Sequence, residues 1–395
     1  MSKQKSPSTK ASKASALFLT LFQILLLFAI GAIGGLCMNR LFNKASTGNF
    51  IYLFIFAYLF ASYYLQIIIH EGGHLVMGLI TGYRFLSFRI GSFIWLKRNG
   101  KISFGRYNIP GTGGQCLLLP PPVNEDGSFP TTLYNMGGVI FNLITALISA
   151  LLALLLRPMP YIALFFVFFG LIGIYFAIVN GIPFPHAMIP NDAVNARLIR
   201  KSPTAMRAFY LSERILEGIA NGQHIYELPD EWFELPSEDE MQNSFTTTIA
   251  VMACERQVSK QNYTGAKDMI RSLLDAPIEM ADYHRNLLKC HLIVCLLLTD
   301  STEDEVNAVL TKEQKKFIQL FSSTLEGVIC QYALSMLWEK DSKKSDVAEV
   351  QFAKLKERYP YPVEAEEAQA RMQTIRQKAV ANSAIPTVSQ WKEQK

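Results

Sequence analysis

The chain has 395 residues, and half of them are hydrophobic, whereas Lys, Arg, Asp and Glu together make up only 18%. This balance points to a membrane protein and does not indicate nucleic-acid binding. Residues 1–200 carry 15 Lys and Arg against 4 Asp and Glu, whereas residues 201–395 carry 23 against 29. A basic, apolar half followed by an acidic, polar half predicts a membrane domain and then a soluble domain.

Four near-continuous apolar runs occupy residues 16–38, 51–80, 133–156 and 160–184. Each has the roughly 20 residues needed to cross the hydrocarbon core of a bilayer. We therefore expect an all-α membrane protein with four transmembrane helices, followed by a soluble α-helical C-terminal domain. The predicted division is a basic N-terminal tail over 1–15, a membrane domain over 16–200, a helical domain over 201–380 and a disordered tail over 381–395.

The distribution of positive charge predicts the orientation. The first 15 residues contain four Lys and no acidic residue, and residues 84–106, after the second run, contain six Lys and Arg. The positive-inside rule places both segments in the cytoplasm of a multi-pass protein of the cell membrane, with the C-terminal domain also cytoplasmic. The second and fourth helices then end on the same side of the membrane, so residues at their C-terminal ends can meet.

The second apolar run contains His70-Glu71-Gly72-Gly73-His74, an H-E-x-x-H sequence. On a helix the two histidines lie on one face, where their imidazoles can bind one Zn²⁺. Glu71 lies beside the metal without binding it, and as a general base it can take a proton from zinc-activated water. Ionisable residues inside an apolar run are costly and mark function, although a hydrogen-bonded histidine pair is the structural alternative.

A catalytic zinc site needs a third protein ligand. Between residues 75 and 200 the only carboxylates are Glu125, Asp126 and Asp192. The first two lie in a Pro-rich loop and are expected to be solvated turn residues. Asp192 follows the fourth helix and is the predicted ligand, with His186 as its competitor.

Three segments in this order resemble the site-2 protease family of intramembrane zinc metalloproteases. The first is the H-E-x-x-H of residues 70–74, the second is the G-x-x-x-N of Gly138–Asn142, and the third is Asn180-Gly-Ile-Pro183 leading to Asn191-Asp192. Val139 and Ala193 replace the usual proline and glycine, and the spacing to Asp192 is similar to that of a subgroup found in Firmicute bacteria.

The resemblance implies cleavage of a membrane-anchored protein or a remnant signal peptide within the lipid bilayer. It also implies that Asn142 and Asn180 bind the unwound substrate or a developing oxyanion, whereas interhelical hydrogen bonding is the alternative for both.

Residues 97–122 alternate briefly at Ile102 and Phe104 and then become rich in Gly and Pro, which predicts a short β-hairpin-like cytoplasmic loop. Gly113, Gly114 and Gln115 are candidates to hold an extended substrate by β-augmentation, the alternative being a plain connecting loop.

Beyond residue 200, amphipathic stretches predict helix pairs that bind a cytoplasmic protein partner. They lie near 242–259, 264–275, 283–298, 314–339 and 364–380. Residues 260–267 weakly resemble the turn of a tetratricopeptide repeat.

Two other functions are compatible with the same sequence. One is a membrane zincin with a downstream glutamate ligand that cleaves outside the bilayer. The other is a non-enzymatic membrane scaffold with a vestigial metal site.

Overall fold

The computed structural model describes residues 8–42, 50–184 and 189–384. The chain forms two compact units. The N-terminal unit comprises the residues up to 90 together with 113–206, and the C-terminal unit comprises 91–112 together with 207 onwards. The C-terminal unit therefore includes residues 91–112, which in the sequence lie between the two segments of the N-terminal unit.

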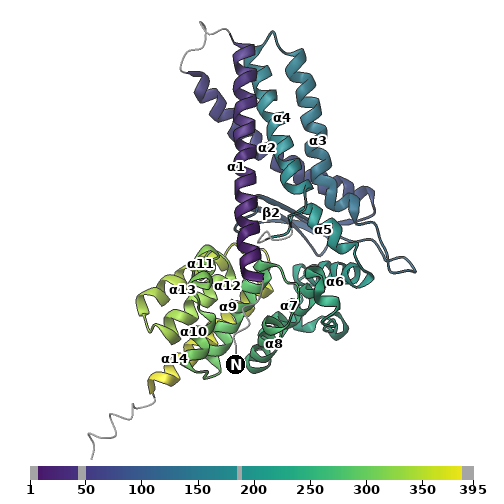
Figure 1. The fold of residues 1–395 in the computed structure, drawn as a ribbon. Helices are drawn as coiled ribbons and strands as arrows, with labels where there is room; N and C mark the ends of the chain where they lie inside the picture. Colours follow the sequence, from purple (N-terminus) through teal and green to yellow (C-terminus); the bar gives the residue numbers. More distant parts are fainter. Residues whose placement is uncertain (1–7, 43–49, 185–188, 385–395) are drawn as a thin grey trace, which may run out of the picture. The chain divides into compact units, whose positions relative to one another are not determined.

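The N-terminal unit contains four long apolar helices (Figure 1). They are α1 (Ser8–Leu41), α2 (Phe50–Ile80), α3 (Thr132–Leu155) and α4 (Pro160–Gly181). All four are long and apolar enough to cross a membrane, α1 over Leu17–Leu41, as the sequence predicted. Helix α2 packs against α3 and α4, and α1 packs against α4. Large apolar side chains such as Phe28 and Leu147 remain exposed around these helices, as expected for surfaces that face lipid.

Local backbone chemistry ends helix α2 and starts the strand that follows it. Gly82 adopts a φ of +88° directly after the helix, and the Tyr83 amide donates to the Gly78 carbonyl. This is the hydrogen bonding of a glycine C-cap, in which the left-handed residue lets the chain turn back over the last carbonyls. Strand β1 (Arg84–Ile90) follows and pairs antiparallel with β4 (Gly114–Leu119).

The C-terminal unit begins with a hairpin of β2 (Phe93–Arg98) and β3 (Lys101–Arg106), which confirms the hairpin predicted around Ile102 and Phe104. Asn99 and Gly100 join the strands with φ angles of 47° and 78°, the conformation that two-residue hairpin turns require. The hairpin packs on the helices of its own unit, since the Arg106 amide donates to the Arg358 carbonyl.

The remainder of the C-terminal unit is helical. Its helices are α6 (Pro203–Ala220, which begins in the N-terminal unit), α7 (Ser244–Ser259), α8 (Tyr263–Asp275), α9 (Asp282–Leu298), α10 (Glu303–Val309), α11 (Lys312–Leu320), α12 (Leu325–Ala333), a π-helical turn (Leu334–Trp338), α13 (Ser342–Lys356) and α14 (Pro362–Ala384). Short 3₁₀ turns lie at Ile225–Glu227, Asp230–Trp232 and Glu240–Gln242.

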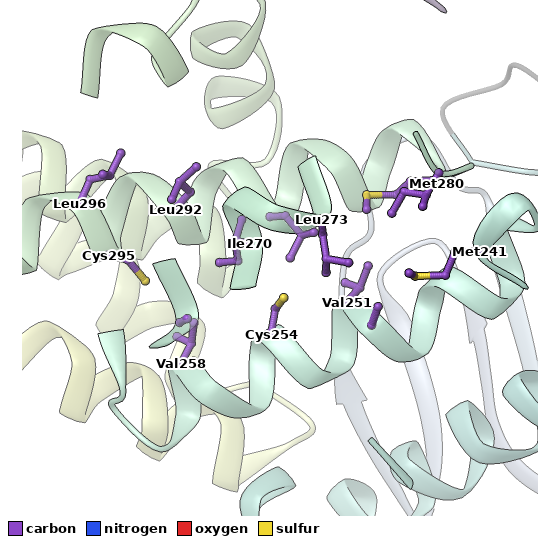
Figure 2. Close-up of a cluster of buried hydrophobic side chains, with 14 of the residues drawn as sticks. Met241, Val251, Cys254, Val258, Ile270, Leu273, Met280, Leu292, Cys295 and Leu296 are labelled. Carbon is purple, nitrogen blue, oxygen red and sulfur yellow. The ribbon is translucent and has the colours of Figure 1, made fainter. Parts of the chain in front are cut away.

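Helices α7, α8 and α9 pack in sequence around a core of aliphatic, methionine and cysteine side chains (Figure 2). The amphipathic stretch near 314–339 forms two helices and a π-helical turn. The break arises because the Thr324 hydroxyl accepts a hydrogen bond from the Gly327 amide and so caps a new helix.

Candidate metal centre

The two histidines of the H-E-x-x-H sequence lie side by side in the interior of the N-terminal unit. His70 and His74 are one helical turn apart on α2 and both are buried. Their Nε2 atoms are 3.2 Å apart. The helix thus presents both imidazoles to one point, as the four-residue spacing predicts.

The hydrogen bonds of the Nδ1 atoms fix the tautomer of each ring. His74 Nδ1 lies 2.8 Å from the Tyr134 carbonyl oxygen, which can only accept, so this nitrogen donates. His70 Nδ1 lies 2.6 Å from Asn142 Oδ1. The Asn142 amide nitrogen donates to the main-chain and side-chain oxygens of Gln66, which assigns Oδ1 as the acceptor from His70. In its neutral form, each imidazole therefore carries its proton on Nδ1 and has a lone pair on Nε2.

Asp192 completes a group of three ligand atoms. Its Oδ2 lies 3.0 Å from His70 Nε2 and 3.4 Å from His74 Nε2. The three ligand atoms all lie within 4.8 Å of one another. The structure thus brings His70 and His74, in the C-terminal half of α2, together with Asp192, which lies beyond the end of α4.

Asn191 positions Asp192. Its side-chain oxygen accepts from the Val194 amide, which caps helix α5 (Asp192–Ile199). Its side-chain nitrogen donates to the carbonyls of Val179 and Ile182 at the end of α4. One asparagine therefore joins the end of α4 to the start of α5 and places the Asp192 carboxylate beside the histidines.

Glycines allow α3 to approach the site closely. A Cβ on Gly73 would lie 2.3 Å from the Gly137 oxygen, and a Cβ on Gly138 would lie 2.5 Å from the His70 ring. Gly138 and Asn142 of the G-x-x-x-N sequence thus have separate roles. Gly138 makes room for the His70 ring, and Asn142 accepts a hydrogen bond from it. In contrast, no atom of the described residues lies within 4 Å of a Cβ built on Gly72.

Glu71 is buried beside the same group. Its carboxylate interacts electrostatically with His70, His74 and Asp192. A Cβ on Gly114, the first residue of β4, would lie 2.5 Å from Glu71 Cγ and Oε1. The bare backbone of β4 therefore starts directly against the Glu71 side chain.

The other predicted site residues have different surroundings. Gln115 follows Gly114 on β4, and because strand side chains alternate, it points away from the face that contacts Glu71. The Asn180 amide donates to the Phe176 carbonyl within α4, and no hydrogen bond or ion pair among the described residues joins Asn180 to the His70, His74 and Asp192 group. His186 lies outside the described residues. Asp126 is exposed and accepts from the Ser128 amide in a turn, as expected for that loop.

Sequence reasoning missed Gln66. This side chain is fully buried one turn before His70, accepts from Asn142 and donates to the Phe169 carbonyl of α4. A glutamine within an otherwise apolar run is a polar residue that must find a partner. That signal, read together with its i, i+4 spacing to His70, indicates the supporting role.

Comparisons with protein-family models, with curated proteins and with solved structures find no match for this chain.

The donor set of the site suits a metal ion. Two Nε2 lone pairs and a carboxylate oxygen converge, and Asp192 Oδ2 is buried with no hydrogen-bond partner among the described residues. Neutral imidazoles whose protons are on Nδ1 cannot donate to that oxygen, so three electron-rich atoms would repel one another without a cation between them. His70, His74 and Asp192 could therefore hold a metal ion.

Proposed function

We propose that the chain is a zinc metalloendopeptidase of the site-2 protease type that cleaves membrane-anchored proteins or remnant signal peptides. The observation that carries the proposal is the convergence of His70 Nε2, His74 Nε2 and Asp192 Oδ2, with Glu71 beside them, in the interior of a unit with four apolar helices. Three protein ligands, two of them imidazoles, are typical of catalytic zinc sites that leave one position open.

Zinc bound there would lower the pKa of a water molecule and polarise the scissile carbonyl. The residues of the chain supply the rest of the chemistry. The Glu71 carboxylate takes the proton from the attacking water and delivers it to the leaving amine, which is the role of a general base and then a general acid. Asn142 and the Tyr134 carbonyl hold the two histidine rings in the tautomer that presents Nε2.

Strand β4 is the proposed substrate-binding element. Peptide bonds in a transmembrane helix are hydrogen-bonded within the helix, so a protease must bind its substrate as an extended segment. Strand β4 pairs with β1 along one edge and begins at Gly114, against Glu71. Pairing of the substrate along the other edge would bring its backbone beside the general base. In this arrangement Gln115 contributes its backbone, and its side chain faces the opposite side.

The proposed location is the cell membrane, with both termini in the cytoplasm. It rests on the four apolar helices and on the distribution of Lys and Arg in the loops. The site lies within α2, a helix of the membrane-spanning set, so the substrate is expected to reach it from the bilayer.

The experiment uses the full chain purified from membranes in detergent. Elemental analysis should find one zinc per chain in the wild type and in Glu71→Gln, and little in Asp192→Asn. Proteins that co-purify with Glu71→Gln are identified by mass spectrometry and offered to the wild-type enzyme. Cleavage should fall by about 10²- to 10⁴-fold in Glu71→Gln. Glu125→Gln, in the loop, is the matched control and should behave as wild type.

The same measurements separate the alternatives. If Asp192→Asn keeps its zinc, the ligand set is that of a different membrane zincin. If Glu71→Gln cleaves as fast as the wild type, the proposed mechanism is wrong. If the wild type holds zinc and cleaves none of the trapped proteins, a scaffold function is favoured.

A further inference from the structure

A cavity of about 160 Å³ lies in the C-terminal unit, where the end of α7 and the start of α8 meet α14. Its lining includes His224, Ser259, Tyr263, Glu366, Glu367 and Arg371. A volume of this size holds about five water molecules at roughly 30 Å³ each, so it fits a carboxyl group with a few attached atoms.

Arg371 is the unusual member of this lining. It is 8% exposed, and the hydrogen bonds and ion pairs of the described residues include none to its guanidinium. A guanidinium carries five N–H donors and stays charged. Its nitrogens are not among the fully buried polar atoms that lack a partner, so they keep access to a ligand or solvent in the cavity. Since Arg371 lines the cavity, an acceptor bound there would satisfy it.

The Ser259 hydroxyl is a second hydrogen-bond donor in the lining of the cavity. Ser259, the last residue of α7, lines the cavity, and its hydroxyl is buried with no hydrogen-bond partner among the described residues. The Tyr263 phenol joins it from the first residue of α8. The lining thus combines one cation and hydroxyl groups with two carboxylates, Glu366 and Glu367.

None of the other charged groups near Arg371 forms an ion pair with it among the described residues. Glu367 is held by His224, whose Nδ1 lies 2.7 Å from its carboxylate. Glu366 is exposed at the edge of the cavity. Glu255 and His291 interact electrostatically with Arg371, without an ion pair. Burial, and secondarily Arg371, lowers the pKa of His291 to about 3, so it is neutral at physiological pH.

We propose that this cavity binds a single carboxylate, with the Arg371 fork on both carboxylate oxygens and the Ser259 hydroxyl as a further donor. The planar guanidinium matches a carboxylate with two parallel hydrogen bonds. Glu366 and Glu367 disfavour a more highly charged anion such as phosphate. The carboxylate is the C-terminal group of a partner peptide or that of a small organic acid.

Calorimetric titration of the full chain in detergent, at constant ionic strength, tests the proposal with four probes. They are acetate, acetyl-Ala-Ala with a free C-terminal carboxylate, the C-terminal amide of the same peptide, and inorganic phosphate. The peptide acid should bind at least about tenfold more tightly than the amide, and phosphate should bind more weakly than acetate. Acetate binding as tight as that of the peptide acid identifies a small acid as the source. Tighter binding of the peptide acid identifies a peptide terminus.

Arg371→Met should weaken carboxylate binding by about 10- to 100-fold. Arg376→Met is the matched control, because Arg376 lies on the same helix and is exposed, so this variant removes the same charge outside the cavity. If Arg371→Met does not fold, Arg371→Lys and Ser259→Ala replace it and should each weaken binding. Equal affinity for acid and amide, tighter binding of phosphate, no binding of either carboxylate at millimolar concentration, or unchanged affinity in the Arg371 variants would overturn the proposal.

Discussion

The buried polar groups of the candidate metal centre and those of the C-terminal unit differ in how they are hydrogen-bonded. In the N-terminal unit, Gln66, Asn142 and His70 form a chain of hydrogen bonds that ends at three convergent ligand atoms. In the C-terminal unit, several buried polar atoms have no partner among the described residues, including Glu213 Oε2, Ser259 Oγ and His291 Nε2. A fully hydrogen-bonded set of side chains that ends in converging lone pairs indicates a metal-binding site. A buried polar group without a partner either binds a ligand or lowers the stability of the folded protein.

We expect the buried Glu213 carboxyl on α6 to lower the stability of the folded protein, and replacing it gives the largest predicted effect. It is buried, and burial raises the pKa of its carboxyl from 4.5 to about 8. As the pH rises from about 5 to 8, the unfolded chain releases this proton first and the folded chain retains it, so stability falls. Below this range the group has no effect, and above it the full penalty is present. Glu213→Gln should remove a penalty on the order of 4 kcal/mol at alkaline pH.

Chemical unfolding of the full chain between pH 5 and 9, followed by the fluorescence of Trp232 and Trp338, measures this difference. Both tryptophans belong to the C-terminal unit. The gain in stability of Glu213→Gln over the wild type should grow with pH. Glu303→Gln, at an exposed position on α10, is the control and should show no such growth. A difference that does not change with pH would mean that Glu213 has a partner in the folded protein.

Asn142 tests the hydrogen-bond chain of the N-terminal unit. Asn142→Leu leaves His70 Nδ1 without its acceptor and Gln66 without its donor. Because the groups that orient a metal-binding histidine fix its tautomer, zinc affinity should fall by about 10- to 100-fold. Competition with a chelator of known affinity measures the change. Asn180→Leu is the control, since Asn180 donates within its own helix, and its zinc affinity should be unchanged.

A substitution at Gly114 tests catalysis separately from metal binding. Gly114→Ala would force a methyl group into the side chain of Glu71 and displace this proposed general base. Cleavage should fall by about 10- to 100-fold, because small displacements of a catalytic group are costly, and zinc should be retained. Gly72→Ala is the control on the other side of Glu71, where a methyl group meets open space. Loss of zinc in Gly114→Ala would show instead that the strand supports the ligands.

Much of the candidate metal site could be predicted from the sequence because its chemistry is local. His70 and His74 are fixed by the period of one helix, and a charged motif in an apolar run has few structural explanations. Asp192 followed from the small number of carboxylates. The exact role of Asn142 could not be predicted, because its partner depends on how α3 crosses α2 at Gly73 and Gly137.

The strands and the cavity were harder to predict for a physical reason. Strand β4 is a short apolar run after a Gly-rich segment, and such runs do not distinguish a strand from a buried helix. Arg371 lies on a polar helix among many charged residues, where an arginine is ordinarily solvated. Only packing shows that this one is buried.

Asn191 gives the smallest predicted effect and tests how α5 is placed. Asn191→Ala removes the N-cap of α5 and the two bonds to the end of α4. The loss of a cap costs about 1 kcal/mol. Because this cap also positions Asp192, the cost should appear as weaker zinc binding, by up to about fivefold. Asn262→Ala removes the corresponding cap of α8 in the C-terminal unit, at a similar cost in stability and with zinc affinity unchanged. If both variants leave zinc affinity unchanged, Asp192 is positioned by the packing of α5 against α3 rather than by its cap.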